Sequence, residues 1–156
     1  VGRRGLLVVA ALIAAELPVV GHIGLTPQAM HAMGGFKVQG RDAQAARELV
    51  DDARALAHAG CFAIVLEGVP DRVAARVTGT VDVPTIGIGS SPACDGQILV
   101  TDDALGLFSD FTPTFVKRYA ELGEEIEKAA EAYAGDVKAR RFPGLEHCFG
   151  VDKDKG

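Results

Sequence analysis

The chain has 156 residues, of which 48% are hydrophobic, and it carries a formal net charge of −5. This length and hydrophobicity are sufficient for one folded domain with a buried core, and they exclude a disordered chain. An acidic chain without clustered lysine and arginine does not suit a phosphate backbone, so we expect no nucleic-acid partner. The three cysteines, an odd number without metal-ligand spacing, favour a reducing, cytoplasmic location over a disulfide framework.

The first predicted element is a core-facing helix over residues 6–15. This apolar run is much shorter than the roughly 20 residues that a membrane span requires, so we expect no membrane association. Two arginines before it resemble the start of a signal peptide. No cleavage site of small residues, after which a mature domain would begin, follows the apolar run. Because no strand precedes this helix, we expect the sequence to begin inside a βα unit.

Short apolar runs then alternate with longer amphipathic ones, which is typical of parallel strands joined by helices. The runs are rich in valine and isoleucine and show no polar alternation, as in strands that are covered on both faces. The predicted strands are residues 18–23, 60–67, 83–89 and 97–101.

Helix signals flank these strands. A helix is predicted over residues 42–59, with Asp42 as its cap and Gly60 at its end, and a shorter one over residues 71–78. A long last helix is predicted over residues 113–135, because proline is tolerated in the first turn and Thr112 can cap it.

The predicted fold class is therefore α/β, and four βα units amount to half of a (βα)₈ TIM barrel, which typically needs about 250 residues. A small open α/β sheet is the structural alternative. We expect one domain over residues 1–156. Its parts are a partial helix of a preceding unit (1–17), the strands and helices (18–112), the long helix (113–135) and a tail (136–156).

Glu67 is the main candidate for chemistry. It closes the apolar run over residues 61–66, at the strand end where barrel enzymes keep their catalytic residues. Apolar neighbours desolvate a carboxylate there, which suits it to act as a general base.

His22 ends the first predicted strand, before Gly24. A neutral imidazole at that place can hydrogen-bond a substrate carbonyl or alkoxide, or it can simply satisfy a loop carbonyl. Gly87 and Gly89 follow the third strand in a turn that lacks the full dinucleotide-binding spacing. We expect these two glycines to permit close packing or the approach of a substrate.

Several further polar residues have less specific roles. Lys37 and Arg41 lie in a long glycine-rich connection and either face an anionic ligand or are surface charges. Asp95 is expected to form a turn. Asp102 and Asp103 are adjacent, so we expect them to cap a helix rather than to share a metal ion.

Seven ordered motifs resemble those of the ketopantoate hydroxymethyltransferase family. The match spans roughly residues 18–149, and its motifs are GHIGLTPQ, GGFKVQGR, IVLEGVP, VPTIGIG, CDGQILV, FVKRYA and FPGLEH. The resemblance implies that the chain is the C-terminal half of a (βα)₈ barrel of the phosphoenolpyruvate/pyruvate-like superfamily. It also implies Mg²⁺ as a cofactor and a large homo-oligomer.

The resemblance further implies transfer of a one-carbon unit from 5,10-methylenetetrahydrofolate to 3-methyl-2-oxobutanoate, giving 2-dehydropantoate. Glu67 matches the proton acceptor of the family, His22 matches a histidine of the substrate site, and Gly87 and Gly89 match its glycine-rich turn. Family members commonly carry Ala-Gly where this chain has Ser90 and Ser91.

The metal ligands of the family belong to the first half of the barrel, so we expect no metal ligand in this chain. Two hypotheses follow for these 156 residues. They either take part in the transferase reaction, or they form a silent half barrel that acts only in assembly. A carbon–carbon lyase or mutase of the same superfamily is a third hypothesis, against which the first two motifs argue.

Overall fold

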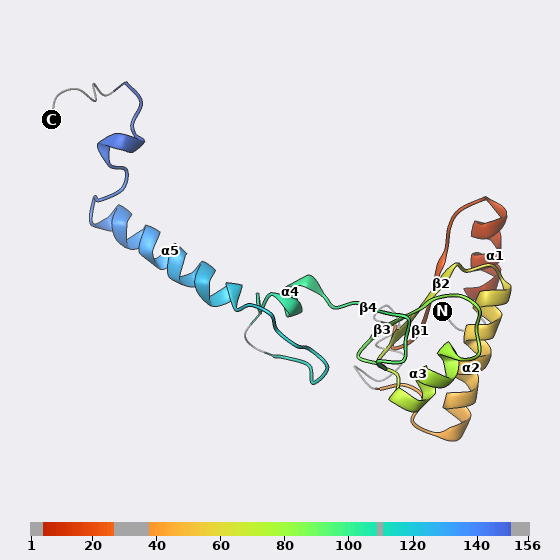
Figure 1. The fold of residues 1–156 in the computed structure, drawn as a ribbon. Helices are drawn as coiled ribbons and strands as arrows, with labels where there is room; N and C mark the ends of the chain where they lie inside the picture. The colour runs from red at the N-terminus through yellow and green to blue at the C-terminus, as the bar shows by residue number, and fades with distance from the viewer. Residues whose placement is uncertain (1–4, 27–37, 109–110, 151–156) are drawn as a thin grey trace. The chain divides into compact units, whose positions relative to one another are not determined.

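The computed structural model describes residues 5–26, 38–108 and 111–150 (Figure 1). The chain forms two compact units, Val1–Leu99 and Val100–Gly156. The expectation of a single domain over residues 1–156 stays a prediction. Within the described residues, none of the helices combines the length and the apolar character needed to cross a bilayer.

The first unit is built on a parallel sheet. Its strands are β1 (Val20–Gly24), β2 (Ala63–Glu67), β3 (Thr85–Ile88) and β4 (Gly96–Gln97), and they pair in the order β1-β2-β3-β4. Each strand lies beside the preceding one, as in a barrel, whereas a doubly wound sheet reverses its strand order. The parallel α/β architecture is thus confirmed, and the strand order is consistent with part of a barrel.

The fourth strand is shorter than expected. Strand pairing was predicted over residues 97–101, but β4 has only two residues, after which Ile98 N still donates to Gly87 O at 3.0 Å. The chain then turns into α4 (Thr101–Ala104), so the end of this prediction was wrong.

Three helices accompany the sheet: α1 (Leu6–Ala14), α2 (Ala43–His58) and α3 (Asp71–Thr78). All three were predicted to within a residue or two. The Oδ1 atom of Asp42 accepts hydrogen bonds from Gln44 N at 2.9 Å and from Ala45 N at 2.8 Å, which confirms the predicted cap. Gly60 follows α2 with a φ of +100°, a conformation that favours glycine.

The core lies between these helices and one face of the sheet (Figure 1). Successive residues of a strand point to opposite faces, so Ile23, Ile64 and Leu66 share the helix-covered face. Gly21 lies there too, because a Cβ at Gly21 would come within 3.0 Å of Leu56 Cδ1. The buried members of the core are Val9, Ile23, Val50, Ala53, Leu56, Cys61, Ile64, Leu66, Val69, Ala74, Val77 and Cys94.

The opposite face carries Val20, His22, Ala63, Val65, Glu67, Ile86 and Ile88, and we call it the open face. Val20 is 42% exposed, Ala63 and Ile88 are buried, and the other four side chains are only partly buried. The strands were expected to be covered on both faces. Within the described residues the helix-covered face is buried throughout, whereas the open face is buried only in part.

The second unit contains α4, α5 (Leu122–Lys138) and the 3-10 helix η3 (Leu145–His147). The long helix was predicted over residues 113–135, but it begins nine residues later and extends further. The preceding segment is hydrogen-bonded to the end of α4, with Tyr119 N donating to Ala104 O at 2.8 Å and Leu122 N to Leu105 O at 2.9 Å. These tertiary bonds outweigh the local start signals at Thr112 and Pro113.

Candidate functional site

Glu67 and His22 meet at the carboxyl ends of β2 and β1. The register pairs His22 with Val65, two residues before Glu67, so both side chains project from the open face. His22 Nε2 lies 3.0 Å from Glu67 Oε2, and the two side chains are 29% and 19% exposed. A carboxylate and an imidazole therefore share a partly desolvated position that a small molecule can still reach.

The backbone fixes the distance between these two strand ends. Leu25 N donates to Glu67 O at 2.8 Å. Gly24 has a φ of +88°, and a Cβ at this position would come within 2.2 Å of Glu67 O. Gly24 thus allows the backbone of β1 to approach that of β2.

Gly87 lies within β3, whereas Gly89 follows it, and the two glycines have different surroundings. Gly87 pairs with Leu66 and so belongs to the helix-covered face, where a Cβ would come 2.9 Å from Gln97 Oε1 and 3.2 Å from Cys94 Sγ. Gly89 follows Ile88 with a φ of +57°, and Ile88 O accepts from Gly68 N at 3.0 Å. The structure thus places Gly89 beside the segment after Glu67, and it directs Gly87 away from the Glu67 side chain.

The remaining polar candidates are Lys37, Arg41, Asp102 and Asp103. Arg41 is exposed, and Lys37 falls outside the described residues. Asp102 and Asp103 lie in the first turn of α4, whose N-cap is Val100 and has no side-chain hydrogen bond. The expectation that these aspartates cap the helix was therefore wrong.

Asp95 makes a contact that the sequence did not indicate. Its Oδ2 atom accepts hydrogen bonds from the N–H and the hydroxyl of Thr85, at 2.8 and 2.9 Å. These bonds hold the pKa of the Asp95 carboxyl below its usual range, because they stabilise the charged form. Asp95 was expected only to form a turn, and no local pattern reveals a partner ten residues away.

Two serines after Gly89 also have partners that sequence reasoning missed. Ser91 is 1% exposed, and its hydroxyl donates to Asp71 Oδ1 at 2.6 Å. The Ser90 hydroxyl donates to Val69 O at 3.3 Å. Both partners belong to the segment that follows Glu67.

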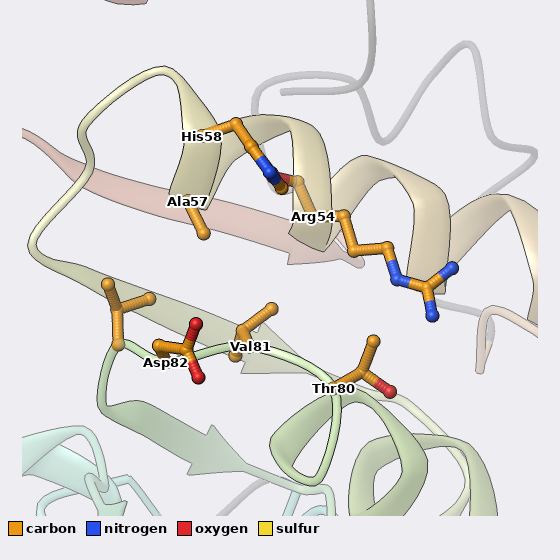
Figure 2. Close-up of a pocket in the computed structure, with 7 residues that line it drawn as sticks. Arg54, Ala57, His58, Thr80, Val81 and Asp82 are labelled. Carbon is orange, nitrogen blue, oxygen red and sulfur yellow. The ribbon is translucent and has the colours of Figure 1, made fainter.

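A shallow cavity of about 150 Å³ lies at the end of the sheet where the strands begin (Figure 2). Its lining includes His58 at the end of α2 and Val83 just before β3, so it opens at the amino ends of the strands. His58 Nδ1 is 2.8 Å from Arg54 O, a contact within its own helix. Barrel enzymes place their chemistry at the carboxyl ends of the strands, and this cavity is therefore not the site of Glu67.

Comparison with known proteins agrees with the motifs around this site. Residues 1–145 match the family model described as ketopantoate hydroxymethyltransferase. The chain belongs to this family. The resemblance seen in the sequence is thus confirmed.

Curated members of the ketopantoate hydroxymethyltransferase family are closely similar to the chain. The 3-methyl-2-oxobutanoate hydroxymethyltransferase of Rhodospirillum rubrum is 60% identical over 152 residues, which are 97% of this chain and 55% of the relative. The enzyme of the same name from Paracoccus denitrificans is 57% identical over 152 residues, with the same coverage. The chain spans about half the length of these relatives, and their names describe transferases.

The Mg²⁺ that family membership suggests does not fit the described residues alone. Among them, no three histidine, cysteine, aspartate or glutamate side chains are grouped as a metal site requires. Glu67 and His22 provide two candidate ligands, whereas Mg²⁺ prefers octahedral oxygen coordination. Glu67 and His22 are therefore considered for the reactions that a carboxylate and an imidazole can perform themselves.

Proposed function

We propose that the chain supplies the proton acceptor of a hydroxymethyltransferase of pantothenate synthesis. The reaction adds a one-carbon unit from 5,10-methylenetetrahydrofolate to 3-methyl-2-oxobutanoate and gives 2-dehydropantoate. The observation that supports this most is the 3.0 Å approach of His22 to Glu67 at the carboxyl edge of a parallel sheet, in a member of this family. The proposal concerns the complete protein, of which these residues are the part that carries the base.

In this proposal Glu67 removes the proton at C3 of the keto acid. The C–H electron pair becomes the π bond of an enolate, and the proton passes to the carboxylate. C3 of the enolate then attacks the one-carbon unit, whose bonds to the two folate nitrogens break; water supplies the hydroxyl oxygen of the product, and tetrahydrofolate is released. A general base must lie within hydrogen-bonding reach of the proton it takes, so a fixed carboxylate is a requirement of this step.

His22 has two tasks in the proposed reaction. Its Nε2 atom is shielded from solvent and faces the Glu67 carboxylate, so it restricts the orientation of that carboxylate. In this proposal its imidazole also donates an N–H to the ketone or to the alkoxide that forms on the new carbon. We include Mg²⁺ and a cytoplasmic location in the proposal on the strength of family membership alone.

The test isolates the first step. Deuterium exchange at C3 of 3-methyl-2-oxobutanoate is followed by proton NMR in heavy water with Mg²⁺ present, on protein made from its complete reading frame. We expect exchange in the wild type and a loss of about 100-fold or more in Glu67→Gln, since general-base catalysis contributes about 10² to 10⁴. Glu48→Gln, which removes an exposed carboxylate on α2, is the matched control and should leave exchange unchanged.

Two results would contradict the proposal. Absence of exchange from a folded wild-type protein would favour the silent half barrel that acts only in assembly. Release of formaldehyde from ketopantoate without a folate would favour a carbon–carbon lyase.

A further inference from the structure

The connection after Glu67 is short and closely held. Residues 68–70 alone join β2 to α3, and Gly68 adopts a φ of +57°. Gly68 N donates to Ile88 O at 3.0 Å, and Val69 is 2% exposed. The position of the Glu67 backbone therefore depends on what holds this connection against the end of β3.

Ser90 and Ser91, which we call the serine strap, provide two side-chain bonds to it. The Ser90 hydroxyl donates to Val69 O at 3.3 Å, and the Ser91 hydroxyl donates to Asp71 Oδ1 at 2.6 Å. The second bond is short because its acceptor is a carboxylate, and charge-assisted bonds of this kind are the stronger ones.

The strap is itself anchored. Ser91 Oγ accepts from Ala93 N at 3.1 Å, and Ser91 O accepts from Gln97 Nε2 at 2.7 Å. The buried serine is thus bonded on both sides, to its own loop and to the start of α3. Such a connected hydroxyl has a single orientation available.

We infer that the serine strap positions Glu67 for proton abstraction, acting through the backbone of residues 68–71. Leu25, which follows β1, holds the strand end on one side through the bond from its N–H to Glu67 O, and the strap holds the following residues on the other. Ser90 and Ser91 are positioning residues, because they are bonded to the segment after Glu67 and act through it. The inference rests on the proposed function, since it concerns the base of that reaction.

The experiment measures kcat and KM for C3 deuterium exchange in variants at both ends of the stronger bond. Ser91→Ala and Asp71→Ala each remove it, whereas Asp71→Asn keeps an oxygen acceptor at Oδ1. We expect each alanine variant to lower kcat about tenfold with little change in KM. A misplacement of about 1 Å can cost about 100-fold, and the loss of one bond should displace Glu67 by less than that. Asp71→Asn should recover most of the rate that Asp71→Ala loses, and the double alanine variant should be no slower than either single one.

Thr80→Ala is the matched control. It removes a hydroxyl that donates to Arg76 O at 2.6 Å. Thr80 belongs to the same unit but lines the cavity at the amino ends of the strands. Unchanged kcat in Ser91→Ala would overturn the inference, and so would a loss that appears only in KM or that equals the loss in Thr80→Ala.

A second measurement separates this inference from the proposed function. Amide hydrogen exchange of Gly68 and Val69, followed by mass spectrometry, should be faster in Ser91→Ala than in the wild type and unaffected in Thr80→Ala. If the wild type shows no C3 exchange, the proposed function fails, and faster amide exchange in Ser91→Ala still supports the hold of the strap on this segment. Unchanged amide exchange overturns the strap whatever the activity.

Discussion

His22 Nε2 is shielded from water and lies 3.0 Å from Glu67 Oε2, so variants of His22 test whether this contact orients the proposed base. In His22→Ala the carboxylate loses its neighbour, and we expect C3 exchange to fall about tenfold to 100-fold by loss of orientation. His22→Gln retains a side-chain N–H donor and should fall less. C3 exchange measured by NMR checks this order, and equal losses in both variants would contradict it.

Asp95 makes the stability of the first unit depend on pH. Its folded pKa is below the ordinary value near 4, because Thr85 donates two hydrogen bonds to the carboxylate. The stability that these bonds give to the first unit is therefore fully present above the pKa of Asp95 in the unfolded state. It is lost as the pH falls through the pKa of Asp95 in the folded state. Urea unfolding between pH 7 and pH 2 should show a smaller acid loss in Asp95→Asn than in the wild type.

Asp82→Asn is the control for this measurement, since Asp82 is an exposed aspartate of the same unit. Its acid loss should match that of the wild type. Equal pH dependence in Asp95→Asn and in the wild type would show that the Thr85 bonds do not contribute.

At the scale of elements, Gly24 allows the end of β1 to lie close against the end of β2. A methyl group there would come within 2.2 Å of Glu67 O, and the φ of +88° disfavours other residues. We expect Gly24→Ala to destabilise the first unit by about 1–3 kcal/mol, the usual cost of backbone strain, and to abolish most C3 exchange. Urea unfolding checks the stability, with Gly79→Ala as control because its added Cβ has an ordinary contact of 3.6 Å to Ala75 O.

The elements that the sequence predicted well are those whose signals are local. Asp42 and Gly60 bracket α2, and both do what their residue types favour. The start of the last helix was wrong, because Thr112 and Pro113 resemble a helix start while hydrogen bonds to α4 hold the following segment outside α5.

The candidate site was predictable in part for the same reason. Strand-end position identified Glu67 and His22, but it did not show that both side chains share one face. The bond from Ser91 to Asp71 spans 20 residues along the chain, and no periodicity reports such a contact. Gly87 was expected in a turn but lies within β3, and only the register of β3 shows that it faces the helices.

At the scale of the whole molecule, we expect these 156 residues to self-associate. Val20 is 42% exposed on the open face, and Ile126 and Tyr133 of α5 are each 59% exposed. Uncovered apolar strands and helix faces tend to pair with another chain. Light scattering should therefore give a mass above the 16.3 kDa of one chain.

Val20→Lys places a charge on the open face and should shift the association toward the monomer. Glu48→Lys, on the exposed side of α2, is the control for the added charge and should not. A wild-type chain that stays monomeric at micromolar concentration would contradict this expectation.

The alternation along β1 and β2 also bears on how this protein can evolve. Ile23, Ile64 and Leu66 maintain folding from one side of the sheet, while His22 and Glu67 occupy the other. A substitution of His22 or Glu67 on the open face can therefore alter the reactivity of the proposed site without creating a cavity in the core between the sheet and the helices. Substitutions that change the substrate can therefore accumulate there while the free energy of unfolding stays high enough for the protein to fold.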